Sequence, residues 1–269
     1  MFLGWARVSY ESDLERFAQR VLCDKHLTLE TYKSFPNLTF VAYEGDEIRA
    51  YISAYIHEKR LLINNFHYEE GVDDSIKERL ITLLLQNVDA TQHSLIVLAH
   101  ICEERIFEKF GFKSYGKFSQ ALYSGDAVAF NFSTAMAKRI SGENFLSTMK
   151  MMDKKAHRED RAEYLSTLMK QSSLVLSTPN GYQHSSVLNK GLVKLSPWVM
   201  EDAAYTDAEQ LLRGVIYHRG LKKILAFVPS DVKEITDLYR AYNFTLTNNM
   251  LLMYKHHKPD INLEMIYAY

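Results

Sequence analysis

Residues His93 to Tyr123 read HSLIVLAHICEERIFEKFGFKSYGKFSQALY. The stretch opens with an apolar run, Leu95–Ala99, whose length is typical of a buried strand. A charged segment, Glu103–Phe110, follows and carries its apolar side chains on one helical face. Gly111 stands where a helix often ends in a left-handed residue, and residues 112–123 then alternate as a strand does. The stretch therefore predicts a strand, a helix, a tight turn and a returning strand.

The same pattern recurs near the C-terminus. Residues 107–112 read FEKFGF and residues 239–244 read YRAYNF, each between a predicted helix and a predicted strand. Each half of the chain is expected to run through helices, a hairpin, a strand, a helix, a strand, a helix and a strand. A long-period repeat explains this order better than one large domain does. We therefore expect two domains, 1–125 and 126–269, that meet at the turn Gly125-Asp126.

Composition narrows the function classes. The chain has 269 residues and a formal net charge of −1, so no basic field favours nucleic acid or an anionic membrane surface as a partner. Its two cysteines stand far apart, and His256-His257 lacks ligand spacing, so we expect no disulfide framework and no metal site. Neither a signal peptide nor an apolar stretch of roughly 18 residues is recognisable, so a cytoplasmic protein is expected.

Periodicity predicts the elements along both halves. Helices are expected at 12–24, 28–33, 75–88, 103–110, 143–152, 159–169, 206–217 and 232–242. Strands are expected at 38–43, 48–57, 61–68, 95–99, 112–123, 127–132, 174–177, 182–188, 192–200, 223–228 and 244–254.

Three sequence runs resemble the GNAT superfamily of acyl-CoA-dependent N-acetyltransferases. The first is IFEKFGFKSYG at 106–116, which looks like the closing signature of that family. The second, residues 40–68, looks like its three central strands. The third is D-x-x-A-x-x-x-D-R at 153–161, which resembles the start of the C-terminal domain in a two-domain subfamily. The resemblance implies an α/β (α+β) fold of two tandem GNAT-like domains, each a mixed central sheet flanked by helices.

The resemblance also implies an activity. Such proteins move an acetyl group from acetyl-CoA, as co-substrate, to a primary amine, so the expected partner is a small-molecule or peptide amine acceptor. A second hypothesis is a GNAT-fold module without catalysis that binds a small molecule or a protein partner. The protein is expected to be a monomer or a homodimer.

The implied cofactor site has a strand part and a helix part. In this family the pantetheine arm pairs with the third strand of the sheet and the diphosphate rests on the start of the next helix. The matching residues are Phe66, His67, Tyr68, Ser75, Ile76 and Lys77. The usual basic residue of the phosphate loop is Val72 here, and Asp73 and Asp74 follow it. Two carboxylates beside a diphosphate are unfavourable, unless they cap the helix and point away.

Candidate catalytic residues are few. Glu58 and His67 are the candidate general bases, with a solvated hairpin acid and a core histidine as their structural alternatives. The usual proton-donating Tyr of the closing helix is Phe107 here, whereas the second half keeps Tyr239 at the matching place. Tyr239 is either the catalytic acid or a core aromatic. Cys102, beside two glutamates, is expected to be buried and inert.

Overall fold

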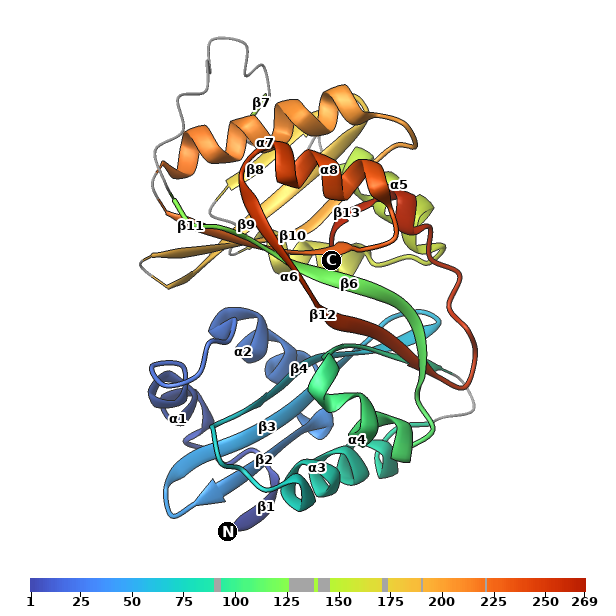
Figure 1. Cartoon of the computed structure of the whole chain (residues 1–269). Helices are drawn as coiled ribbons and strands as arrows, with labels where there is room; N and C mark the ends of the chain where they lie inside the picture. The colour runs from blue at the N-terminus through green and yellow to red at the C-terminus, as the bar shows by residue number, and fades with distance from the viewer. Residues whose placement is uncertain (90–92, 126–137, 140–145, 171–173, 190, 221) are drawn as a thin grey trace. The chain divides into compact units, whose positions relative to one another are not determined.

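The computed structural model describes the 269-residue chain except for residues 90–92, 126–137, 140–145, 171–173, 190 and 221. The described residues form two compact units (Figure 1). Unit 1 contains Met1–Tyr115 and Leu252–Pro259, and unit 2 contains Gly116–Leu251 and Asp260–Tyr269. The boundary expected between residues 125 and 126 borders residues outside this description and stays a prediction, as does the strand expected at 127–132.

Unit 1 is a mixed sheet with helices on both faces. Its strands are β1 (Phe2–Trp5), β2 (Thr39–Glu44), β3 (Glu47–Ile56), β4 (Arg60–Tyr68) and β5 (Ser94–His100), in that spatial order. Its helices are α1 (Tyr10–Phe17), α2 (Lys25–Ser34), α3 (Asp74–Gln86) and α4 (Glu104–Lys109). The pairs from β1 to β4 are antiparallel, whereas β4 and β5 run parallel. In Figure 1, α1 and α2 cover one face of this sheet, and α3 and α4 cover the other.

Helix α1 differs from its prediction. The helix expected at 12–24 begins at Tyr10 and ends at Phe17, and β1 was not expected at all. Asp24 begins the next helix instead, because its carboxylate accepts a hydrogen bond from the backbone N–H of Leu27, 3.0 Å away. The prediction was wrong here because an apolar pattern was extended through residues that form a turn.

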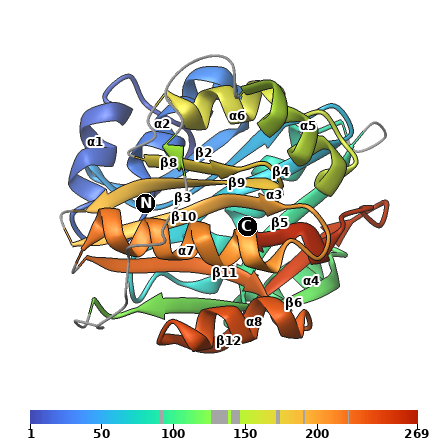
Figure 2. The ribbon, with the colours of Figure 1, turned by 90° about the horizontal axis from the view of Figure 1, so that it is seen from above.

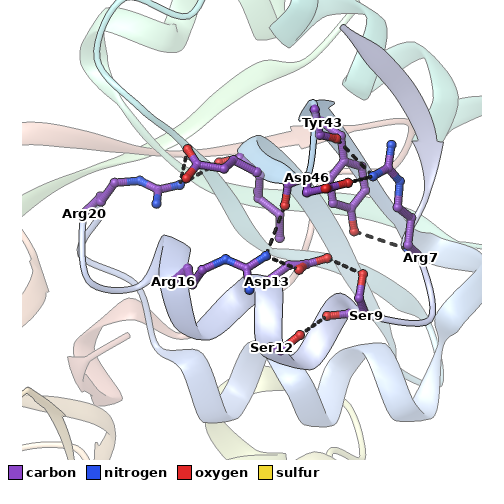
Figure 3. A network of polar contacts seen from close by, with 11 residues as sticks. Arg7, Ser9, Ser12, Asp13, Arg16, Arg20, Tyr43 and Asp46 are labelled. Carbon is purple, nitrogen blue, oxygen red and sulfur yellow. Dashed lines mark hydrogen bonds and ion pairs between the residues drawn. The ribbon is translucent and has the colours of Figure 1, made fainter.

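Polar contacts attach α1 to the β2–β3 hairpin (Figure 3). Ser9 Oγ donates to Asp13 Oδ2 at 2.6 Å, and Arg16 lies 2.5 Å from the other oxygen of the same carboxylate. Arg16 also donates to the backbone carbonyl of Asp46, 3.1 Å away. The guanidinium of Arg7 lies 4.2 Å from the ring centroid of Tyr43. These contacts fix the helix over the apolar core that Tyr10, Leu14 and Phe17 share with β2 and β3.

Unit 2 repeats the architecture of unit 1. Its strands are β6 (Lys113–Tyr123), β7 (Lys138–Arg139), β8 (Leu174–Thr178), β9 (Gly181–Asn189), β10 (Leu192–Met200), β11 (Lys223–Pro229), β12 (Phe244–Lys255) and β13 (Ile266–Ala268). Its helices are α5 (Leu146–His157), α6 (Ala162–Met169), α7 (Tyr205–Arg219) and α8 (Lys233–Ala241). The spatial order is β6, β11, β10, β9, β8 and β7, and β13 pairs with β10. Figure 2 shows α5 and α6 on one face of β8–β11, and α7 and α8 on the other.

Strand β12 serves both units. Its residues up to Leu251 belong to unit 2, whereas Leu252–Lys255 belong to unit 1, where β12 neighbours β5. Ser94 Oγ donates to the carbonyl of His257 at 2.5 Å, and Lys255 Nζ donates to the carbonyl of Phe110 at 2.6 Å. Unit 1 is therefore completed by residues from the far end of the chain. Two units, each a mixed sheet flanked by helices, agree with the fold class expected from the sequence, but the completion of unit 1 by the end of β12 was not expected.

Candidate functional site

The parallel strands β4 and β5 separate within unit 1. Their ladder joins Arg60–Ile63 to Ser94–Val97 and then ends, although β4 continues to Tyr68 and β5 to His100. Beyond Ile63, β4 continues to pair antiparallel with β3, its one partner there among the described strands. Phe66, His67 and Tyr68 are half-buried, unlike the buried residues that precede the separation. The residues 64–68 therefore present one backbone edge that β5 does not pair.

A bulge and a buried polar network mark the point of separation. The register between β3 and β4 shifts after Ser53, so that both Asn64 and Asn65 lie near this serine. Asn65 Nδ2 donates to Ser53 Oγ at 2.8 Å, and Asn65 Oδ1 accepts from Thr28 Oγ1 at 2.9 Å. Asn64 Nδ2 donates to Thr31 Oγ1 at 2.7 Å. Because these polar atoms are paired, two asparagines can occupy the interior side of β4 and hold the bulge in place.

The start of α3 is occupied by an acidic cap. Asp73 accepts a hydrogen bond from the backbone N–H of Ser75, 2.7 Å away, and the Ser75 hydroxyl together with this backbone bond lowers the pKa of Asp73. The alternative in which this carboxylate caps the helix is therefore confirmed. Lys77 Nζ lies 2.9 Å from Asp74 Oδ1 and 4.1 Å from the ring centroid of Tyr68. Of the predicted cofactor residues, the structure thus brings Tyr68 and Lys77 together.

A buried acid lies at the ends of β4 and β5. Tyr68 donates its hydroxyl proton to Glu103 Oε1 at 2.8 Å, and Glu103 Oε2 accepts the backbone N–H of His100 at 2.9 Å. Burial raises the pKa of Glu103, and burial together with the Glu103 carboxylate raises the pKa of Tyr68 well above its ordinary value. Sequence reasoning missed Glu103. The signal available was an acid three residues after the last strand residue, the spacing of a capping box.

Cys102 is exposed, so the expectation of a buried cysteine was wrong. Its Sγ lies 2.9 Å from His100 Nδ1, which also accepts the backbone N–H of Cys102 at 3.3 Å. The buried cysteine is Cys23, and burial raises the pKa of its thiol to about 11.

The structure separates the candidate bases. His67 lies on the diverging part of β4, with its ring centroid 5.4 Å from that of Tyr51, which belongs to the apolar core beneath α1. Glu58 is exposed in the turn between β3 and β4, before the paired part of β4 begins. At about 3.3 Å per strand residue, some 20 Å or more separate Glu58 from the diverging edge of the strand. Phe107 is fully buried between Phe66 and Phe112, with ring centroids 5.4 and 5.2 Å away.

In unit 2 a pair of parallel strands also separates, but a third strand lies in the gap. β10 and β11 pair from Leu192–Lys194 to Lys223–Leu225, and the two strands then part. β13 pairs antiparallel with the released part of β10. Tyr239, the candidate acid, is fully buried here and donates its hydroxyl proton to the carbonyl of Tyr267 in β13, 2.9 Å away.

No cluster of three or more histidine, cysteine, aspartate or glutamate side chains in the described residues could hold a metal ion. None of the helices described is both long and apolar enough to span a membrane.

Solved structures show what this architecture is similar to. A candidate acetyltransferase of Pyrococcus horikoshii superposes with a TM-score of 0.75 at 15% identity, over 99% of this chain and 93% of that one. A GCN5-related N-acetyltransferase of Sphaerobacter thermophilus gives a TM-score of 0.64 at 14% identity, with 98% of both chains covered. A tandem GNAT protein from the clavulanic acid biosynthesis pathway gives 0.64 at 9% identity, over 96% of this chain and 100% of that one. No protein-family model and no curated protein matches the sequence. At such low identity the likeness shows a fold: this chain has the tandem GNAT fold.

Proposed function

We propose that unit 1 binds acetyl-CoA where β4 and β5 diverge and transfers the acetyl group to a primary amine of a small molecule or a peptide. The observation that carries this proposal is the edge of β4 at residues 64–68, which continues past the ladder with β5. An extended amide-containing chain, such as a pantetheine arm, can pair with such an edge as an added strand does. The tandem GNAT fold supports the same assignment.

His67 is the general base in this proposal. It lies on the diverging part of β4, whereas Glu58 lies at the opposite end of that strand. A neutral imidazole can take a proton from an ammonium group, directly or through one water, and so leave the amine nucleophilic. Bound acetyl-CoA supplies the thioester that the amine attacks.

Tyr68 supplies the proton for the leaving thiolate. It is the hydroxyl-bearing residue of the segment Asn64–Tyr68, and Phe107, at the position usual for the acid, cannot donate. Burial and the Glu103 carboxylate keep the Tyr68 pKa high, so the hydroxyl stays protonated at neutral pH. The Glu103 carboxylate accepts the Tyr68 hydroxyl and so orients it. After each turnover Tyr68 regains a proton from water and His67 releases to water the one it took from the amine, so the protons balance.

The diphosphate lies at the start of α3, with Lys77 as its cation. The N–H of Ser75 already bonds to Asp73, and Lys77 bonds to Asp74, so a diphosphate must compete with both carboxylates. The strand edge thus fits acetyl-CoA well and the helix start fits it less well. This predicts a modest affinity for acetyl-CoA.

The acidic helix start also favours a second function. Asp73 occupies the N-terminus of α3, and Phe107 stands in place of the usual Tyr. A unit with these two features can keep the fold and act as a binding module without catalysis. Such a module would take a small molecule or protein partner along the same edge of β4. Release of CoA thiol with any amine acceptor would exclude this alternative.

The test combines binding and turnover. Acetyl-CoA titrated calorimetrically into the whole protein should give heat, and a panel of polyamines, amino sugars, amino acids and peptides should reveal an acceptor through thiol release. His67→Gln should then lower kcat by about 100-fold with little change in the affinity for acetyl-CoA, since it removes proton transfer alone. Glu58→Gln is the matched control and should leave kcat unchanged. The absence of heat at millimolar acetyl-CoA would contradict the proposal.

A further inference from the structure

We propose that β13 occupies the gap between β10 and β11 in unit 2 in the way an acetyl-CoA arm would. Unit 2 then binds no acetyl-CoA, and the protein binds one acetyl-CoA per chain. The single acetyl-CoA rests on the function proposed for unit 1. The strand-binding assignment does not, because it follows from contacts inside unit 2.

The backbone of this segment bonds to both diverging strands. β13 runs antiparallel to β10, with Trp198 opposite Ala268 and Val199 opposite Ile266. The N–H of Tyr269 donates to the carbonyl of Phe227 in β11 at 2.9 Å. The separated strands thus recover their missing hydrogen bonds from a third strand. An arm of acetyl-CoA would need the same backbone groups.

The side chains of β13 are as buried as those of a core strand. Ile266, Tyr267 and Ala268 are each at most 1% exposed. The Tyr267 ring centroid lies 5.3 Å from that of Trp198. The carbonyl of Tyr267 accepts the hydroxyl proton of Tyr239, which has no exposed surface. Tyr239 thus occupies the position of the acid in the sequence pattern, yet its hydroxyl serves to hold the strand.

The segment that leads into β13 is held by the D-x-x-A-x-x-x-D-R run. The N–H of Asn262 donates to the carbonyl of Ala156 at 2.8 Å, in the last turn of α5 where carbonyls lack helical partners. Asp153 in the same run bonds to Arg161 at 2.9 and 3.2 Å and accepts the hydroxyl of Tyr182 at 2.9 Å. These buried contacts fix the end of α5. The D-x-x-A-x-x-x-D-R run therefore positions the segment that leads into β13.

The loop before α7 also forms a hydrogen bond with this segment. Asn262 Nδ2 donates to Asp202 Oδ1 at 3.2 Å, and Glu201 is paired with Lys155. In the tandem arrangement this loop corresponds to the one before α3, where a diphosphate is expected. Two carboxylates engaged with the protein's own side chains disfavour an anion there.

Hydrogen exchange of the whole protein, read by mass spectrometry with and without acetyl-CoA, tests the proposal. In the free protein the amides of 266–268 should exchange slowly, and those of 64–68 faster. Acetyl-CoA should slow exchange at 64–68 and leave 266–268 unchanged. Calorimetry on the same sample should give one acetyl-CoA per chain.

A pair of tyrosine variants tests the strand contact without any ligand. Tyr239→Phe removes only the hydroxyl that bonds to Tyr267 and should speed exchange at 266–268 about fivefold, as loss of one buried hydrogen bond would. Tyr242→Phe is the matched control, because this tyrosine ends the same helix but bonds to Glu209 at 2.5 Å. It should leave the exchange at 266–268 unchanged.

The outcomes separate the two proposals. Two acetyl-CoA per chain, or faster exchange at 266–268 when acetyl-CoA is added, would overturn the assignment of unit 2. Equal exchange at 266–268 in Tyr239→Phe and the parent protein would overturn the strand contact. Absence of acetyl-CoA binding contradicts the function of unit 1 alone, and the response of Tyr239→Phe then still supports β13 as the ligand of unit 2.

Discussion

Unit 1 and unit 2 each contain a pair of parallel strands that begin paired and then separate. In unit 1 the released residues Phe66, His67 and Tyr68 are half-buried, and among the strands described β3 is the one that pairs with them. In unit 2 the released residues Trp198, Val199 and Met200 are fully buried, because β13 lies against them. Among the described residues, the same architecture thus appears once with β4 extending past its ladder with β5, and once with a third strand, β13, paired to the separated part of β10.

The difference teaches how a repeated fold divides its roles. A free edge leaves backbone donors and acceptors to water and makes them available to a ligand. A filled edge satisfies the same groups permanently and adds apolar burial. Unit 2 therefore gains stability at the place that, in the function proposed above, binds acetyl-CoA in unit 1.

The largest expected effect concerns the stability of unit 2. Asp153→Ala leaves the buried guanidinium of Arg161 without its bidentate partner, which should cost about 3–5 kcal/mol of unfolding free energy. Urea unfolding followed by the fluorescence of Trp198, in a Trp5→Phe background, reports this unit, since Trp198 is its buried tryptophan.

Lys154→Ala is the control for that variant. Lys154 is exposed and lies 3.8 Å from the exposed Asp160, so its removal should change the free energy by less than about 0.5 kcal/mol. Equal unfolding midpoints for the two variants would contradict the role given to Asp153.

The second-largest expected effect is on kcat and compares Tyr68 with Tyr239. Tyr68→Phe should lower kcat by about 10- to 100-fold while the affinity for acetyl-CoA stays nearly constant, because a proton donor is lost and the ring remains. Tyr239→Phe should leave kcat as in the parent protein, since its hydroxyl is bonded to Tyr267 inside unit 2. A large loss of kcat in Tyr239→Phe alone would move the reaction to unit 2.

The smallest effect concerns the acidic start of α3. Asp73→Asn keeps a side chain that caps the helix but removes one charge, and should tighten acetyl-CoA binding roughly fivefold. Asp74→Asn is the comparison, because it also frees Lys77 from its ion pair and should tighten binding by a similar amount. Calorimetric titration measures both.

The pH dependence of the Asp73 effect follows from its pKa. Hydrogen bonds from Ser75 hold the Asp73 pKa below the usual range, so the carboxylate stays charged at neutral and mildly acidic pH. Lowering the pH from 8 to 6 should therefore leave the advantage of Asp73→Asn unchanged. A gain that disappears at pH 6 would show that another group causes the repulsion.

Much of this could be predicted from the sequence. The apolar run before Gly111 and its echo before Asn243 indicated two similar units, and both residues have the positive φ that such helix ends require, 82° and 61°. Asp73 as a helix cap was one of the two alternatives that the sequence left open. These features depend on neighbours within a few residues, which is why a single sequence reveals them.

The remaining features depend on residues far apart in the chain. The sequence by itself determined the repeat, the helix ends at Gly111 and Asn243, and the types of side chain on β4. Only the tertiary structure decided that Glu103 reaches Tyr68, that Leu252–Lys255 complete unit 1, and that β13 fills the divergence in unit 2. The physical reason is that a strand edge and a buried hydroxyl accept any segment that satisfies their hydrogen bonds. Which segment does so is settled by packing of the whole chain and not by local pattern.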